Sequence, residues 1–486
     1  MKKSFVFNLF FMVFVNMLIK PFWVFGVDRT VQNEIGEAEY GLYFAIFNFT
    51  YLFQILLDFG FQNYNSREVA ADHRKINTLL PDIVTFKIIL LLFYVLLCVA
   101  VAYPLGYLSH SFIWIILLNQ ILLSFNIYWR SNVSAHQHFI TDALLSVLDK
   151  LLMIVFCSIL IWGNIPALPL TVFNFAMAQL LAYGITFVVC MWTALRLTDR
   201  LHFQVHFGRL KTIAVETMPY AVIHFLMTTY YRIDAVMLEQ LQGANGALES
   251  GIYAQGYRIM EALNNIGYLL AAVLLPLFAY KLAKSQQIKT VLKSGLSIMF
   301  CVAVSIIICL FWYRMDIIVL LYKSSQPQYA AQVFGCLLLN FFPVAMLYVI
   351  GTLLTANQNF RWMIASLVIA VVLNIVLNYY WIQSRGAFGA ALATLATQLF
   401  MLCSYTIYGV YIFRLRVRLK YVAQLALFAG ACLVLVFLLD SVHWFADDLK
   451  NMGMRMLLYF VSVPVLALLS GLVGRQTLAL KVGIAE

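Results

Sequence analysis

Long apolar runs separated by short polar breaks recur from one end of the 486-residue chain to the other. A bilayer core of about 30 Å requires about 20 residues of helix, so runs cut at polar or Gly/Pro-marked breaks predict about fourteen membrane-spanning helices. The predicted helices cover residues 5–26, 41–61, 83–103, 111–130, 143–162, 168–195, 213–238, 252–277, 293–313, 332–355, 362–382, 387–412, 420–440 and 453–473. No hydrophilic stretch is long enough for an extramembrane domain, so the expected fold is an all-α integral membrane bundle.

The composition agrees with this pattern, because 63% of the residues are hydrophobic and only 11% are charged. Soluble domains contain about 45–50% apolar and about 25% charged residues, so a water-soluble fold is excluded. The eight cysteines lie in or beside apolar runs without metal-ligand spacing, which predicts neither a disulfide framework nor a metal site. The apolar stretch after Lys2 and Lys3 is long enough to span the bilayer, and we interpret it as the first helix instead of a signal peptide.

Lysine and arginine gather on one side of the predicted membrane topology. If the N-terminus is cytoplasmic, the cytoplasmic segments hold several times more of these residues than the external ones. The positive-inside rule therefore predicts a multi-pass protein with both termini in the cytoplasm. The same bias accounts for most of the net charge of +11, so no nucleic-acid partner is expected. Five cations fall within predicted helices, namely Lys20, Lys87, Lys150, Arg232 and Arg258.

The basic loop from Arg196 to Lys211 lies almost midway through the first twelve predicted helices. We interpret it as a hinge between an N-terminal lobe, residues 1–197, and a C-terminal lobe, residues 198–416. Six helices in each lobe would relate the lobes by a pseudo-twofold axis along the membrane normal. Residues 417–486 would add two further helices.

Three stretches resemble the polysaccharide-unit flippases, which export O-antigen and capsule repeat units and belong to the multidrug/oligosaccharidyl-lipid/polysaccharide (MOP) exporter superfamily. Residues 39–70 hold Asp58-Phe59-Gly60 and then Arg67-Glu68, residues 230–276 resemble the family's seventh and eighth helices, and residues 353–398 contain an Asn-rich helix followed by Gly389-Ala390-Ala391. The resemblance implies a MATE-like fold and alternating access around a central cavity. The implied substrate is an undecaprenyl-pyrophosphate-linked oligosaccharide, moved from the cytoplasmic to the periplasmic leaflet of a bacterial inner membrane.

Three of the intramembrane cations share one predicted depth. At about 1.5 Å per residue, Lys20, Arg232 and Arg258 lie roughly 8–9 Å below the external ends of their helices. An arginine fork and a lysine point charge suit the two phosphates of a pyrophosphate, so these residues are predicted to bind it. The structural alternative is that they join helices through ion pairs, for which Arg258 and Glu261 have the required i,i+3 spacing.

Polar and aromatic side chains also follow the predicted seventh and eighth helices at spacings of three or four. Such stripes suit sugars, whose C–H faces pack on rings while their hydroxyls bind amides and carboxylates. Tyrosine is abundant at 27 residues, so single tyrosines are also consistent with an interfacial belt. The predicted sugar-binding residues are Tyr231, Tyr253, Tyr257, Glu261 and Asn265.

Intramembrane acids and a histidine are candidates for ion coupling or gating, since a carboxylate in a low-dielectric cavity can exchange protons. The candidates are Asp58, Asp149 with Lys150, His224, Asp234 and Glu261. The sequence does not choose between H⁺, Na⁺ and the membrane potential, and it predicts no resident cofactor or catalytic residue. Pro21 is expected to bend the first helix.

Two other transport functions fit the same fold. A MATE-type multidrug antiporter would repel its cationic substrates at buried arginines, and a lipid II flippase would differ mainly in the glycan that it carries. A glycosyltransferase or polymerase would require a larger external catalytic loop than residues 440–452 provide. Membrane lipids, a polysaccharide polymerase and glycosyltransferases are the expected partners, in the O-antigen, capsule or lipopolysaccharide pathway.

Overall fold

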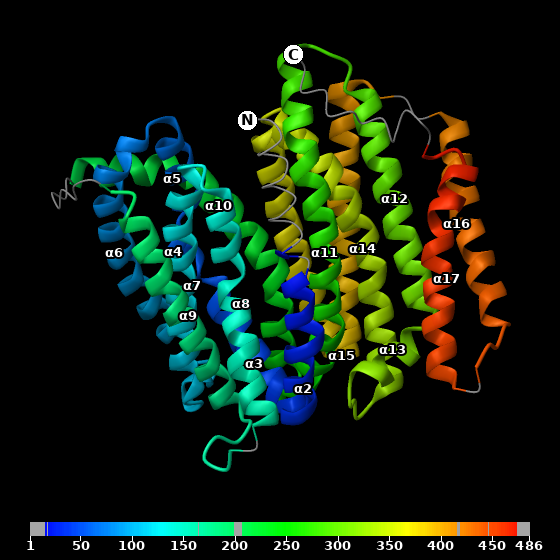
Figure 1. Cartoon of the computed structure of the whole chain (residues 1–486), viewed down its shortest axis with the longest axis horizontal. Coiled ribbons are helices and arrows are strands. Elements are labelled where there is room, and N and C mark those ends of the chain that lie inside the picture. The colour runs from blue at the N-terminus through cyan, green and yellow to red at the C-terminus, as the bar shows by residue number, and fades with distance from the viewer. Residues whose placement is uncertain are drawn as a thin grey trace. The chain divides into compact units, whose positions relative to one another are not determined.

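The computed structural model describes residues 15–16, 18–163, 165–198, 207–415, 418–445 and 447–473. Helices make up nearly all of this part of the chain, and it contains no strand (Figure 1). The chain divides into two compact units, Met1–Ala254 and Gln255–Glu486. Mean hydropathy of +0.88 leaves few polar side chains to satisfy backbone groups, and in a bilayer helices satisfy those groups within themselves.

The first unit contains ten helices of α-type within the described residues, counting α11, which continues into the second unit. Their bounds are α2 Arg29–Ile35, α3 Glu37–Leu52, α4 Ile55–Asp58, α5 Phe61–Ala71, α6 Ile76–Ala102, α7 Phe112–Ala135, α8 Phe139–Trp162, α9 Val172–Leu195, α10 Phe207–Leu241 and α11 Gly246–Ala283. A six-residue π-helix, Trp23–Asp28, precedes them and begins two residues after Pro21. The helix is therefore locally widened just after Pro21, and the bend expected at Pro21 stays a prediction. Residues 5–14 and 17 of the predicted first helix lie outside the described residues.

Helix α3 is central to the packing of the first unit. It contacts α7 and α9, and it packs extensively against α10. Gly41 of α3 and Gly251 of α11 allow these two helices to touch through their backbones, since a Cβ at Gly41 would overlap the carbonyl of Ala247 and a Cβ at Gly251 would overlap that of Glu37. Gln32 Nε2 adds a hydrogen bond of 3.0 Å to the Gly251 carbonyl. Two glycines therefore fix a backbone-to-backbone contact in this unit.

The second unit contains the rest of α11 and six further helices: α12 Lys289–Trp312, α13 Arg314–Leu321, α14 Pro327–Ala356, α15 Phe360–Phe413, α16 Leu419–Asp440 and α17 Asp448–Leu469. The 54-residue α15 is interrupted at Gly386, whose φ of 55° is unfavourable for side chains with a Cβ. Trp362 stacks on Tyr408 with ring centroids 4.6 Å apart, and the hydroxyls of Ser366 and Ser404 lie 2.7 Å apart. These pairs show that the two arms of α15 run antiparallel, side by side.

The helices agree with the predicted membrane bundle. Within the described residues, eleven helices are long and apolar enough to cross a bilayer. One of the eleven is α15, whose arms match the predicted helices 362–382 and 387–412, and α10 covers the predicted helix 213–238. The fold is therefore the all-α multi-pass bundle that the hydropathy pattern predicted, and the total of about fourteen spans is consistent with it.

The compact units do not divide where the basic loop suggested. The predicted lobes meet at residues 197 and 198, whereas the contacts divide the chain after Ala254. The difference arises because α10 packs against α3 and the first turns of α11 pack against Gly41. The predicted lobes 1–197 and 198–416 describe a topological repeat, and that repeat stays a prediction.

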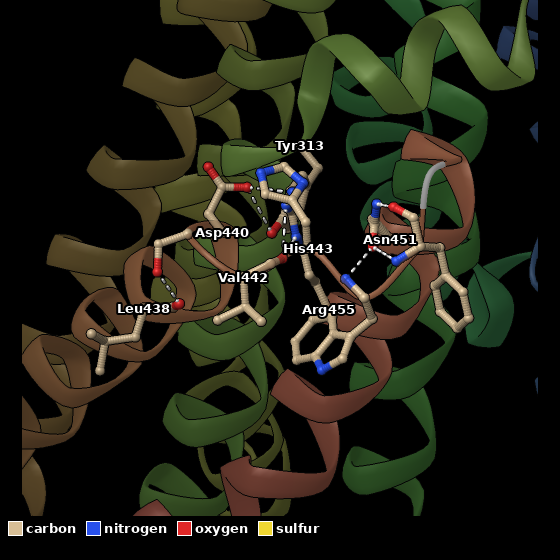
Figure 2. A network of polar contacts seen from close by, with 10 residues as sticks. Tyr313, Leu438, Asp440, Val442, His443, Asn451 and Arg455 are labelled. Carbon is tan, nitrogen blue, oxygen red and sulfur yellow. Dashed lines mark hydrogen bonds and ion pairs between the residues drawn. The ribbon is translucent and has the colours of Figure 1, made fainter.

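A polar network joins the facing ends of α16 and α17 to the residue after α12 (Figure 2). Arg455 donates to the Asp440 carboxylate at 2.9 Å and, through two nitrogens, to the carbonyl of Val442 at 3.0 and 3.1 Å. Its Nη2 lies 3.2 Å from His443 Nδ1, and Tyr313 donates to Asp440 at 3.3 Å. Burial and the Asp440 carboxylate raise the pKa of Tyr313 to about 12, so its hydroxyl keeps the proton that it donates.

Arg455 should therefore be important for holding the α16–α17 hairpin. We expect Arg455→Met to lower the free energy of unfolding by about 1–3 kcal/mol, because Asp440 and the Val442 carbonyl lose their donor. Thermal unfolding of the purified protein in detergent measures this effect. Lys450→Ala is the matched control, since its ion pair with Asp447 is exposed and should contribute less than about 1 kcal/mol. Equal stability of the two variants would contradict the role given to Arg455.

Candidate substrate site

Arg232 of α10 is positioned by two residues of α3. Its Nη1 donates to Asn48 Oδ1 at 3.1 Å, and its guanidinium carbon lies 4.8 Å from the centre of the Tyr51 ring. Asn48 is buried, and its own Nδ2 donates to the carbonyl of Phe44, which fixes the direction of the amide. Both of these contacts are with uncharged side chains, and they orient the guanidinium. A half-buried cation oriented in this way can bind an anionic group.

Two acids of α10 are paired with tyrosines. Asp234 is 2% exposed and accepts a hydrogen bond of 2.9 Å from Tyr253, and Glu239 accepts one of 2.7 Å from Tyr107. Asp28 is bound in the same way by Tyr40, at 2.7 Å. Burial and the neighbouring Glu239 raise the pKa of Tyr107, so its hydroxyl stays a donor. Tyr253, from the next helix along the chain, is therefore a hydrogen-bond donor to Asp234.

Arg258 forms the ion pair that its spacing allows. Its Nη1 lies 2.8 Å from Glu261 Oε2, and Asn265 donates to the Glu261 carbonyl at 2.9 Å on the next turn. The Arg258 and Glu261 side chains keep 14% and 27% of their surface exposed. This pair is the structural alternative considered from the sequence. It leaves the binding role of Arg258, Glu261 and Asn265 a prediction.

Lys20 belongs to a second group of charges in the first unit. Lys150, Asp149 and Arg130 are the charged groups that act on it. Lys150 lies 3.4 Å from Asp149, and its ammonium faces the rings of Trp23 and Tyr183 at 5.6 and 5.5 Å. Arg130 is bound to Asp142 at 3.0 Å. The sequence analysis gave Lys20 and the Asp149–Lys150 pair separate roles, and it did not predict that these charges lie in one group.

The remaining predicted residues lie in varied surroundings. Tyr253 is 1% exposed, which places its ring in the packed core. Tyr231 is half-buried and packs edge-on against Tyr230, while Tyr257 is half-buried on α11. His224 is exposed, with Nδ1 3.4 Å from Thr228 Oγ1. Asp58 ends α4, and the nearby ion pairs of Arg67 are made with Glu68 and Glu216.

Two hollows of the second unit do not involve the predicted residues. One, of about 500 Å³, is lined by Met315 of α13, by Gln326 just before α14, and by residues of α14 that include Tyr329 and Gln332. The other, of about 450 Å³, lies between the arms of α15 beside Trp362 and Cys403. Within the described part of the chain, no group of three or more His, Cys, Asp or Glu residues is arranged to hold a metal.

The sequence model of a family described as polysaccharide biosynthesis protein matches residues 6–281, more than half of the chain. The chain belongs to this family. No curated protein sequence matches it. The family match covers Lys20, Arg232 and Arg258, so all three cations lie in the part of the sequence that defines the family.

Solved structures with the same fold extend over nearly the whole chain. A lipid II flippase MurJ in an inward closed conformation has a TM-score of 0.67 at 14% identity and covers 96% of this chain and 97% of its own. An inward-facing multidrug resistance MATE transporter has a TM-score of 0.59 at 14% identity, covering 83% and 98%. A MOP superfamily transporter from Pyrococcus furiosus has a TM-score of 0.55 at 14% identity, covering 84% and 95%. This polysaccharide biosynthesis protein therefore has the MATE-like fold of the MOP superfamily.

Proposed function

We propose that this protein is a flippase that moves undecaprenyl-pyrophosphate-linked oligosaccharide units from the cytoplasmic to the periplasmic leaflet by alternating access. The observation that carries the proposal is the membership in a polysaccharide biosynthesis family together with a fold shared with a lipid II flippase. The relevant anionic group is the pyrophosphate, and the oriented, half-buried guanidinium of Arg232 suits it. The protein acts as a transporter in this proposal, without covalent chemistry of its own.

Most of the predicted residues then have a role in the transport cycle, whereas the Tyr253 ring is buried in the core. Lys20, Arg232 and Arg258 bind the pyrophosphate, and Tyr231, Tyr257, Glu261 and Asn265 contact the sugars. Asp58, Asp234, Glu261 and His224 are the candidates for H⁺ or Na⁺ coupling. The proposed location is the bacterial inner membrane with both termini in the cytoplasm, where glycosyltransferases supply the substrate and a periplasmic polymerase takes the product.

Two rival substrates follow from the shared fold. A MATE-type antiporter would carry organic cations, which the Arg232 guanidinium and the Lys20–Lys150 group disfavour by charge repulsion. A lipid II flippase would carry the same pyrophosphate anchor with a different glycan. The charge of the pyrophosphate anchor therefore distinguishes the proposed flippase from a cation antiporter. Only the glycan distinguishes it from a lipid II flippase.

Reconstituted liposomes distinguish these three substrates. We expect the purified protein to move fluorescent undecaprenyl-pyrophosphate oligosaccharide between leaflets at least about tenfold faster than protein-free liposomes, and ethidium at the protein-free rate. Protection of the label from a membrane-impermeant quencher measures leaflet transfer. Faster transfer of lipid II than of the oligosaccharide lipid would assign the lipid II function instead. Transport of ethidium alone would contradict the proposal.

A further inference from the structure

The second predicted span is broken inside its apolar run. Helix α4 ends at Asp58, Phe59 and Gly60 both have left-handed backbones with φ of 44° and 79°, and α5 begins at Phe61. A continuous helix would pair the carbonyl of Leu57 with the amide four residues later. Here the Leu57 oxygen accepts a hydrogen bond of 2.6 Å from Lys87 Nζ, a side chain of α6. A lysine ammonium therefore caps the end of a helix within the bundle.

Lys87 is fully enclosed. Its side chain is 0% exposed, and Nζ makes a second hydrogen bond of 2.7 Å to Ser124 Oγ of α7. Three rings surround the ammonium, with centres 5.9, 5.1 and 5.8 Å away, from Phe61, Phe125 and Tyr128. Burial of an ammonium among rings is tolerated because the ring faces carry negative potential. Burial of the ammonium nevertheless costs desolvation free energy, which a nearby negative charge must offset.

The charge that balances Lys87 is Asp58, at the end of α4. Asp58 acts on Lys87 electrostatically, yet among the described residues no carboxylate lies within 4.0 Å of the Lys87 ammonium. Asp58 Oδ1 is buried and has no hydrogen-bond partner in the structure. The end of α4 adds the partial negative charge of a helix C-terminus. Asp82 of α6, five positions before Lys87, is also buried, but it is not among the charges that act electrostatically on Lys87.

We propose that Lys87 is a tethered cation that occupies a monovalent-cation site at the break in the second span. The site consists of two oxygen ligands, the Leu57 carbonyl and the Ser124 hydroxyl, of the kind that hard cations bind, and the Asp58 carboxylate lies more than 4.0 Å away as the balancing charge. An ammonium with three donors replaces the free ion and is held by its own four-carbon chain. Removal of the ammonium leaves the oxygen ligands in place, so the vacated site should take K⁺ or NH₄⁺ from solution.

Thermal unfolding of the full-length protein in detergent tests this inference, which is independent of the transported substrate. The midpoint of Lys87→Ala would be compared with that of the wild type in NH₄Cl, KCl, NaCl and N-methyl-D-glucamine chloride at equal ionic strength. We expect the wild type to unfold at one temperature in all four salts. We expect Lys87→Ala to unfold about 5 °C or more lower in N-methyl-D-glucamine and to recover saturably with NH₄⁺ or K⁺. An equal loss in all four salts, or no loss, would overturn the proposal.

Two further variants keep the test decisive if Lys87→Ala does not fold. Lys87→Met combined with Asp58→Asn removes both charges, so it should fold and show no dependence on the cation. Failure of this double variant to recover stability relative to Lys87→Met alone would also overturn the proposal. Lys75→Ala is the matched control, because Lys75 directly precedes α6 and its ion pair with Glu68 is exposed. Its unfolding temperature should stay within about 2 °C of the wild type in every salt.

Discussion

Replacement of Arg232 by alanine should reduce the transfer of undecaprenyl-pyrophosphate oligosaccharide about 100-fold in reconstituted liposomes. The proposed role of Arg232 is a charge-assisted, two-pronged contact with phosphate, and loss of one such oriented donor group commonly costs a factor of about 100. Arg232→Lys should lose about tenfold, because it keeps the charge but not the planar fork. Asn48→Ala should show a smaller loss, since it removes only the 3.1 Å bond that orients the guanidinium.

A matched arginine separates this effect from a general loss of positive charge. Arg196 lies at the end of α9, is exposed, and stacks on Trp192 at 3.6 Å. Arg196→Ala should leave the transfer rate unchanged. All variants should be compared at equal amounts of folded protein, measured by size-exclusion chromatography. Full transport by a folded Arg232→Ala protein would remove Arg232 from the proposed site.

The contact between Gly41 and Gly251 should be highly sensitive to an added Cβ. Gly41→Ala should lower the free energy of unfolding by about 3 kcal/mol, because the new Cβ overlaps the Ala247 carbonyl and backbone cannot rotate away as a side chain can. Gly251→Ala should have a similar effect through the Glu37 carbonyl, and it also disturbs the bond from Gln32. Thermal unfolding and the yield of monodisperse protein measure both changes.

Gly184 provides the control for the same substitution. It lies within α9, and a Cβ added there would have no other heavy atom within 4 Å. Gly184→Ala should therefore stabilise the protein by about 0.5–1 kcal/mol, since alanine is the better helix former. The opposite signs expected at Gly41 and Gly184 distinguish a steric effect from helix propensity. Destabilisation at both positions would contradict this account.

The sequence predicted those features that depend on neighbours within a few residues. The spans follow from unbroken apolar runs, and the Arg258–Glu261 pair follows from i,i+3 spacing on one helix. The resemblance of the sequence to the polysaccharide-unit flippases is confirmed by the match to the polysaccharide biosynthesis family and by the MATE-like fold. Such features need no knowledge of which helices are in contact.

Features that depend on helix neighbours were not predictable in this way. Tyr253 binds Asp234 from another helix, and the grouping of Lys20 with Lys150 joins segments far apart in the sequence. The break at Phe59 and Gly60 was also missed, because both residues fit the apolar run that hides it. Hydropathy shows where a chain is apolar. It does not show where the backbone becomes left-handed and ends a helix, or which buried charge binds the free carbonyl at that end.

The hairpin within α15 has a consequence for biogenesis. Its arms reverse at Gly386, directly after the short, exposed polar stretch 383–385, and they are joined along their length by pairs such as Ser366 with Ser404. A ribosome delivers the first arm before the second, yet the first arm gains its partner only when the second has emerged. The two arms should therefore leave the translocation channel for the lipid as one inserted hairpin.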